Sequence, residues 1–130
     1  MTLRISSKLH RQLVAMAAAS PDQEICGLLI GSDRVERFIP TGNVAVDPRR
    51  DFEIDPETLF AAIRAERAGG EKLIGYYHSH PAGRPAPSPK DAAQATADGR
   101  IWVIIGEQRV TAWVMTTAGN FMQVSCQIDD

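Results

Sequence analysis

The sequence is poor in cysteine and has no long apolar run, and both absences narrow the class of protein. Only Cys26 and Cys126 are present, without a Cys-x-x-Cys pair, so we expect two buried free thiols rather than a disulfide or a ligand pair. The longest apolar stretches, near residues 25–30 and 101–105, are far shorter than the roughly 18 residues that a membrane-spanning helix needs. The first residues lack the basic start and apolar core of a secretory signal. We therefore expect a cytoplasmic protein with no membrane partner.

A strong excess of charge of either sign is also missing. Fourteen basic and sixteen acidic side chains give a net charge of −2, with no cluster of Lys or Arg. We therefore expect no nucleic-acid partner. A chain of 130 residues that is 44% hydrophobic and 23% charged can bury a core without disulfide or metal staples. We expect one domain over residues 1–130, in which any metal would serve chemistry rather than folding.

The order of apolar segments and of Gly and Pro breaks predicts an α/β domain built on a single mixed β-sheet flanked by helices. Helices are expected over residues 7–19, from 56 to about 68, and from 88 onward, the last two after an N-cap residue followed by proline. Strands are expected over residues 25–31, 35–39, 52–54, 73–77, 101–105, 110–115 and 121–128, with a turn at 118–120 before the last strand.

Two of the three histidines, His78 and His80, directly follow the apolar segment 73–77. Side chains two positions apart on a strand point to the same face, so both imidazoles can reach one metal ion. Asp91 follows after a loop stiffened by several prolines, and such a loop can return its carboxylate to the strand end. Two imidazoles and one carboxylate suit zinc and leave a fourth position for a water, whose pKa the metal lowers to about 7.

Glu24 and Ser88 provide what hydrolysis needs besides a metal. Glu24 immediately precedes the most apolar segment, so we expect a poorly solvated carboxylate that can act as general acid/base. The hydroxyl of Ser88, three residues before Asp91, can donate to a developing oxyanion. Each residue alone has a simpler interpretation: Glu24 as a surface carboxylate, Ser88 as a helix N-cap with Asp91 as its capping-box acid, and the histidines as structural. The capping and oxyanion roles of Ser88 do not exclude each other.

Taken together, these residues resemble the active-site motif of the JAMM (MPN+) metalloprotease family. The resemblance rests on Glu24, on His-Ser-His-Pro at 78–81 and on Pro-Ser-Pro-Lys-Asp at 87–91. Residues 25–31 match the family's first core strand, and residues 52–57 are similar to a segment of its small prokaryotic members. The resemblance implies a cytidine-deaminase-like α/β fold.

For the site, the resemblance implies one zinc ion per chain held by His78, His80, Asp91 and a water. It implies that Glu24 is the general acid/base and that Ser88 steadies the tetrahedral intermediate. The family hydrolyses isopeptide or peptide bonds after the C-terminal tail of ubiquitin or ubiquitin-like proteins. Its small prokaryotic members resemble enzymes that trim sulfur-carrier proteins with a ubiquitin-like fold.

The leading hypothesis is therefore a zinc-dependent peptidase or isopeptidase whose substrate is a ubiquitin-like or sulfur-carrier protein. One alternative is a catalytically inactive scaffold or binding module with the same fold. A second is a deaminase-like enzyme acting on a small molecule, although the thiolate ligands of that class would require a Cys-x-x-Cys pair. The loop at 80–88 also resembles that of RadC-like relatives. Exposed edge strands are compatible with a homodimer.

Overall fold

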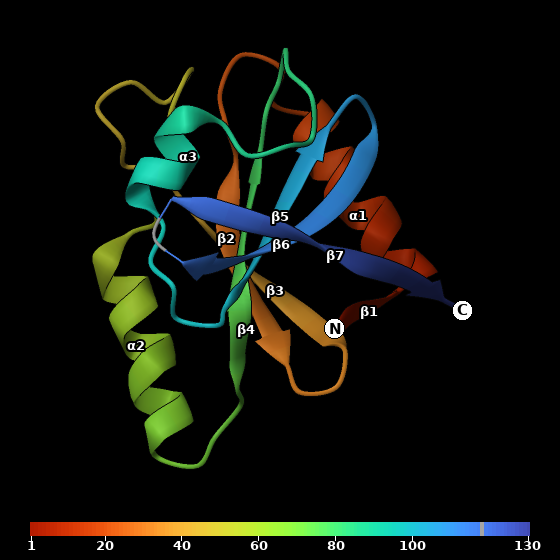
Figure 1. Cartoon of the computed structure of the whole chain (residues 1–130), viewed down its shortest axis with the longest axis vertical. Coiled ribbons are helices and arrows are strands. Elements are labelled where there is room, and N and C mark those ends of the chain that lie inside the picture. Colours follow the sequence, from red (N-terminus) through yellow and green to blue (C-terminus); the bar gives the residue numbers. More distant parts are fainter. Residues whose placement is uncertain (118) are drawn as a thin grey trace.

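The computed structural model describes residues 1–117 and 119–130, so Ala118 of the predicted turn lies outside the described residues. The described chain forms a seven-stranded mixed sheet with strand order β1-β7-β6-β5-β4-β2-β3 (Figure 1). The strands are β1 (Thr2–Ser6), β2 (Cys26–Gly31), β3 (Val35–Thr41), β4 (Leu73–Ser79), β5 (Ile101–Gly106), β6 (Arg109–Thr117) and β7 (Asn120–Asp129). The helices are α1 (Ser7–Ala18), α2 (Pro56–Arg67) and α3 (Pro89–Gln94).

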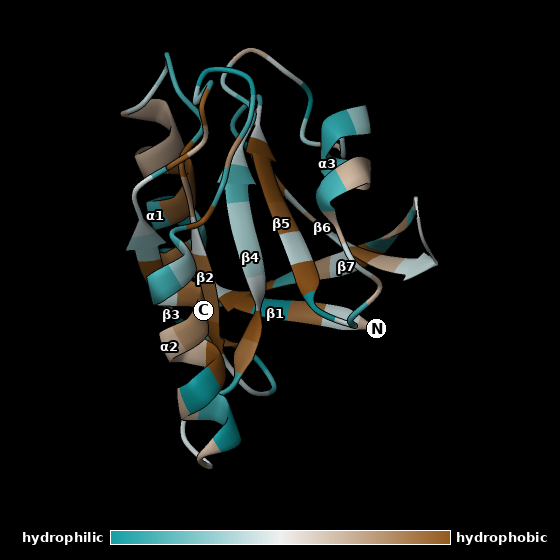
Figure 2. Ribbon diagram, turned by 90° about the vertical axis from the view of Figure 1, so that its left-hand side faces the viewer, coloured by the Kyte–Doolittle hydropathy of each residue, from teal (hydrophilic) through white to brown (hydrophobic). Residues whose placement is uncertain are grey.

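The strand β4 lies inside the sheet, where it pairs in parallel with β5 and in antiparallel with β2. The strand β1 is parallel to β7, and the remaining neighbours are antiparallel. Every residue of β2 and β5 is buried, as expected for strands covered on both faces. Both strands carry mostly hydrophobic residues (Figure 2). The side chains of β4 are therefore held between two paired strands, β2 and β5.

The helices cover the two faces of the sheet differently. On one face, α1 packs Leu9, Leu13 and Met16 into the larger core, at the spacing of one helical face. On the other face, α2 contributes Leu59 and Ile63 to a second core that also contains Phe52 and Trp102. The short helix α3 lies on the same side as α2, near the upper end of β4 in Figure 1.

The predicted single mixed sheet with flanking helices is confirmed, with three local differences. The strand β1 was not predicted, because only Leu3 and Ile5 of this short segment are buried. Residues 52–54 form no strand but a single bridge between Asn43 and Ile54. The strand β4 continues through Ser79, because it stays paired with β2 and β5 on both sides. Consequently His78 lies within a strand rather than after one.

Two further expectations concern cysteines and membranes. Both Cys26 and Cys126 are free thiols, the first buried and the second half-buried. No helix in the described part of the chain is long and apolar enough to cross a membrane.

Candidate metal centre

The end of β4 places two imidazoles side by side. The Nε2 atoms of His78 and His80 lie 3.1 Å apart. His78 is fully buried, with the Phe52 ring stacked on it at 4.1 Å and the Trp102 ring edge-on at 5.5 Å. Its Nδ1 atom has no hydrogen-bond partner among the described residues, so aromatic packing orients this ring. Burial lowers the pKa of His78, which keeps the imidazole neutral at neutral pH with a lone pair available to a metal.

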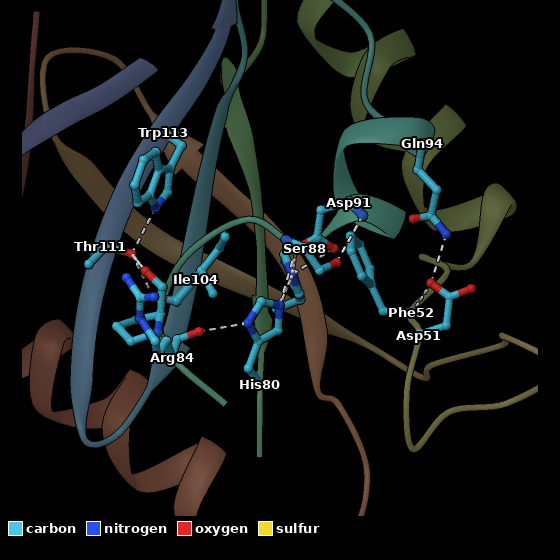
Figure 3. Close-up of polar contacts among 12 residues, drawn as sticks. Asp51, Phe52, His80, Arg84, Ser88, Asp91, Gln94, Ile104, Thr111 and Trp113 are labelled. Atoms are coloured by element: carbon cyan, nitrogen blue, oxygen red, sulfur yellow. Dashed lines mark hydrogen bonds and ion pairs between the residues drawn. The ribbon is translucent and has the colours of Figure 1, made fainter. Parts of the chain in front are cut away.

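His80 is oriented by the loop that follows β4. Its backbone N–H donates to Ile105 O at 2.8 Å, and its ring Nδ1–H donates to Arg84 O at 2.8 Å (Figure 3). Because Nδ1 carries the proton, Nε2 is left with the lone pair that a metal ion needs. The backbone of this loop therefore selects the ligating tautomer of His80.

Asp91 joins the histidines through the start of α3. The carboxylate oxygen Oδ2 lies 3.2 Å from Nε2 of both His78 and His80. The same oxygen accepts the backbone N–H of Ser88 at 2.9 Å, while Ser88 Oγ accepts the N–H of Asp91 at 3.1 Å. This reciprocal pair is a capping box. Burial alone would raise the pKa of Asp91, but the two adjacent imidazoles and the N–H of Ser88 outweigh it and hold that pKa well below its usual range.

The loop between His80 and α3 is anchored against the end of β5 and β6. Gly106 lies directly beneath it, and a Cβ atom at that position would be 2.6 Å from Gly83 O and 3.0 Å from Pro85 N. The hydroxyl of Thr111 donates to Pro85 O at 2.5 Å and accepts from Trp113 Nε1 at 2.9 Å (Figure 3). These contacts fix the path by which the chain returns from the strand end to Asp91.

The three ligand atoms fit a zinc ion. The Nε2 atoms of His78 and His80 and Oδ2 of Asp91 form a nearly equilateral triangle with sides of 3.1, 3.2 and 3.2 Å. Tetrahedral zinc with bonds of about 2.0–2.1 Å holds its ligand atoms about 3.3 Å apart. Two neutral imidazoles and one carboxylate are also the donors that zinc accepts. The geometry and the chemistry of the donor set therefore agree.

Glu24 lies beside this triangle, just before β2. Its side chain is only 7% exposed, and its Oε1 atom has no hydrogen-bond partner in residues 1–117 and 119–130. Burial raises the pKa of Glu24 to about 7, a value suited to a group that takes and returns a proton near neutral pH. Ligand atoms of Glu24, His78 and His80 lie within 4.8 Å of one another. Glu24 is therefore close enough to the two imidazoles to contact a water bound beside them.

Ser88 and Glu24 line the same pocket. This pocket has a volume of about 220 Å³ and also includes His80. The Ser88 hydroxyl can cap α3 by accepting from Asp91 N and still donate its own proton. The structure thus brings all five sequence-predicted residues to one place.

Three contributors to this site were not found from the sequence. Asn43 donates from Nδ2 to Glu24 O and to Asp51 O, each at 2.9 Å, and so fixes the backbone that carries Glu24. Ser79 Oγ accepts the N–H of Ile25 at 2.9 Å and ties β4 to the same segment. Phe52 packs on His78. Asn43 belongs to no local pattern. Ser79 and Phe52 lie within the segments 78–81 and 52–57 that resemble the family, but those patterns do not predict their contacts, although the position of Ser79 between two histidines was a signal that it faces the other way.

Comparison with known proteins places the chain in a family. Residues 6–116 match the family described as prokaryotic homologs of the JAB domain. A protein of Haloferax volcanii named desampylase is 34% identical over 119 residues, which cover 87% of this chain and 84% of that protein. The CysO-cysteine peptidase of Mycobacterium tuberculosis is 33% identical over 79% of this chain and 72% of its own length. A solution structure from Desulfitobacterium hafniense superposes with a TM-score of 0.81 at 25% identity, covering 98% of this chain and 93% of that one. The chain therefore belongs to the prokaryotic homologs of the JAB domain, within the JAMM (MPN+) family that its motif predicts.

Proposed function

We propose that this protein is a zinc-dependent peptidase or isopeptidase that hydrolyses the amide bond after the C-terminal tail of a ubiquitin-like or sulfur-carrier protein. The observation that carries the proposal is the triangle of His78, His80 and Asp91 atoms beside the buried, unpaired Oε1 of Glu24. The relatives named desampylase and CysO-cysteine peptidase support the same reaction class.

In this proposal, His78, His80 and Asp91 hold the zinc ion. A zinc ion with three protein ligands supplies Lewis acidity, which makes water a nucleophile at neutral pH and polarises a carbonyl. Neighbouring groups hold these three ligands in place. Arg84 O accepts a hydrogen bond from His80, the N–H of Ser88 donates one to Asp91, and the Phe52 ring stacks on His78. Such outer contacts set ligand orientation and basicity.

Glu24 moves the proton. Its carboxylate takes a proton from the attacking water at Oε1, and the water oxygen bonds to the carbonyl carbon of the scissile amide. When the C–N bond breaks, Glu24 returns that proton to the leaving nitrogen, so the products are a free amine and a carboxylic acid on the carrier, which ionises by releasing the second proton of the water to solvent. The burial that raises the pKa of Glu24 to about 7 makes both transfers accessible near neutral pH.

Ser88 stabilises charge in this mechanism. Its Oγ accepts from Asp91 N at 3.1 Å, which orients the hydroxyl at the edge of the pocket shared with Glu24 and His80. From there the hydroxyl donates to the oxygen that becomes negative as the carbonyl is attacked. One such donor contributes about 100- to 1,000-fold in rate.

The remaining sequence-based hypotheses belong to the same proposal. Residues 1–130 act as one domain, in the cytoplasm, on a protein substrate and without a nucleic-acid or membrane partner. A homodimer would form through the sheet edges β1 or β3. A scaffold with this fold has no use for a buried carboxylate such as Glu24, because an unpaired buried acid lowers stability.

The test is a cleavage assay. The tag-free protein, loaded with zinc, is incubated with a ubiquitin-fold carrier that ends in Gly-Gly and is extended by a short peptide, and the products are identified by mass spectrometry. We expect a single cut after the last glycine, lost with a chelator, restored by zinc and absent in Glu24→Gln. Glu36→Gln, on the exposed face of β3, serves as the control. Cleavage by Glu24→Gln at the wild-type rate would reject the proposed mechanism.

A further inference from the structure

The pocket beside the candidate metal centre carries two arginines that the proposed reaction does not use. Arg49 and Arg50 line the pocket of about 220 Å³ together with Glu24, His80 and Ser88. Both arginines are exposed. They come from the segment between β3 and α2, whereas the proposed metal-binding residues come from β4, the loop after it and α3.

The backbone that carries the arginines is fixed relative to Glu24. The N–H of Glu24 donates to Pro48 O at 2.8 Å. The N–H of Arg50 donates to Asp47 O at 3.2 Å and closes a turn around Pro48. The guanidinium groups therefore extend from a turn that is hydrogen-bonded to the proposed general acid/base itself.

Neither guanidinium has a counter-ion among the residues that the structure describes. The ion pairs and side-chain hydrogen bonds formed within the described chain engage Arg4, Arg37, Arg100 and Arg109 but neither Arg49 nor Arg50. The adjacent Asp51 accepts from Gln94 Nε2 at 2.7 Å and from the Phe52 N–H at 2.9 Å (Figure 3). The two guanidinium groups that line the pocket are thus available to bind an anionic group of a ligand.

The chemistry of hydrolysis decides which part of the substrate enters this pocket. Glu24 returns a proton to the leaving nitrogen, so that nitrogen must come within hydrogen-bond reach of its carboxylate. The leaving group therefore lies on the side of the metal that Glu24 lines. A pocket of about 220 Å³ has room for a single amino acid beside Glu24.

We propose that Arg49 and Arg50 form a subsite for the α-carboxylate of the leaving group. This inference rests on the proposed function and specifies its substrate class: a carrier protein whose C-terminal glycine is joined to the α-amine of one free amino acid. Guanidinium groups bind carboxylates through charge-assisted hydrogen bonds. An isopeptide-linked lysine of a protein offers no carboxylate next to its scissile bond and would not use this subsite.

The test compares two substrates that differ in one group. A ubiquitin-fold carrier ending in Gly-Gly is extended by one alanine, with either a free carboxylate or a carboxamide at its end. Wild-type enzyme is expected to favour the carboxylate by about 10-fold or more in kcat/KM, mainly through KM. The double substitution Arg49→Gln, Arg50→Gln is expected to bring the ratio of the two kcat/KM values close to one. Arg67→Gln, an exposed arginine at the end of α2, should keep the wild-type ratio.

Binding gives a readout that does not require turnover. In Glu24→Gln, the affinity for each uncleaved substrate is measured by calorimetry, and the carboxylate form is expected to bind about 10-fold more tightly. Cleavage of both substrates with equal efficiency would overturn the subsite alone. A loss that affects both substrates equally in the arginine variant would also overturn it, because the arginines would then contact the carrier. Failure of the wild-type enzyme to cleave either substrate would overturn the proposed function, and the subsite with it.

Discussion

The side chain of Asn43 holds the backbone of Glu24 through a hydrogen bond of 2.9 Å from Nδ2 to Glu24 O. The same amide group donates to Asp51 O at 2.9 Å, and its Oδ1 accepts the N–H groups of Ala45 and Glu53 at 3.0 and 3.1 Å. One side chain thus fastens the segment after β3 to the residue that we assign as general acid/base. Asn43 touches no reacting atom in this account and acts as a positioning residue.

Substitution of Asn43 by alanine is therefore expected to lower activity without removing the metal. Four hydrogen bonds are lost, so the free energy of unfolding should fall by about 1–3 kcal/mol. We expect kcat/KM to fall by about 10-fold or more, because small misplacements of reacting groups are costly, while the zinc content stays at the wild-type level. Asn120→Ala, which removes an exposed contact with Thr117 in the last hairpin, is the control. Unchanged kcat/KM in Asn43→Ala would contradict the positioning role.

Glu24 should make the stability of the metal-free protein depend on pH. Its pKa is about 7 in the folded protein, against an ordinary value of 4.5. Between these pH values the folded state binds more protons than the unfolded state, so stability falls as the pH rises. Above about pH 7 the penalty is complete and amounts to at most about 3 kcal/mol.

Glu24→Gln removes this penalty and tests it. In the presence of a chelator, the variant should be more stable than wild type at about pH 8 and close to it at about pH 4, as measured by urea unfolding. The exposed Glu36, changed to Gln in the same way, should show no such dependence. If Glu24→Gln and wild type differ in stability by the same amount at both pH values, burial does not raise the pKa of Glu24 in the folded protein.

Ser88 has two roles that a matched pair of variants can separate. Ser88→Ala removes the N-cap of α3 and should cost about 1 kcal/mol of stability, and it also removes the proposed oxyanion donor, which should lower kcat by about 100- to 1,000-fold. Asp55 is the N-cap of α2, where its side chain accepts from Glu57 N at 3.2 Å. Asp55→Ala should cost a similar stability and leave kcat unchanged. If both variants changed kcat equally, Ser88 would act only as a helix cap and not as an oxyanion donor.

Gly106 is not a proposed zinc ligand, but we expect its substitution to weaken zinc binding. A Cβ at this position would lie 2.6 Å from Gly83 O, so Gly106→Ala must shift the loop whose Arg84 O orients His80. We expect zinc to bind about 10-fold or more weakly, measured by competition with a chromogenic chelator. Gly42→Ala is the control, because a Cβ there would meet no atom within 4 Å. Wild-type affinity in Gly106→Ala would show that the loop can move without disturbing His80.

The parts of the fold predicted from the sequence are those with a strong local signal. The apolar runs of β2 and β5 and the proline-marked helix starts at Asp55 and Ser88 were found where predicted, because burial and capping are encoded within a few residues. The strand β1 was missed, since its position is fixed by parallel pairing with β7 at the other end of the chain. Residues 52–54 have strand-like composition, but Ile54 pairs only with Asn43.

The site, like the fold, could be predicted only where the sequence carries a local signal. His78, His80 and Asp91 could be predicted because their spacing and the capping motif are local, and Glu24 and Ser88 because their sequence contexts match the family motif. Asn43 and the arginines at 49 and 50 could not be found this way. Their importance depends on two hydrogen bonds, one from Asn43 Nδ2 to Glu24 O and one from the Glu24 N–H to Pro48 O. These bonds join segments that the sequence does not show to be neighbours.

The metal content of two variants tests the central claim most directly. Tag-free protein purified without chelator is analysed for zinc per chain in wild type, Glu24→Gln and Asp91→Asn; the asparagine keeps an acceptor for the N–H of Ser88 and so preserves the helix cap. We predict about one zinc per chain in wild type and Glu24→Gln, and loss of most of it in Asp91→Asn. Zinc retained in Asp91→Asn but lost in Glu24→Gln, or no zinc in the wild-type protein even after it is added, would contradict the site assigned here.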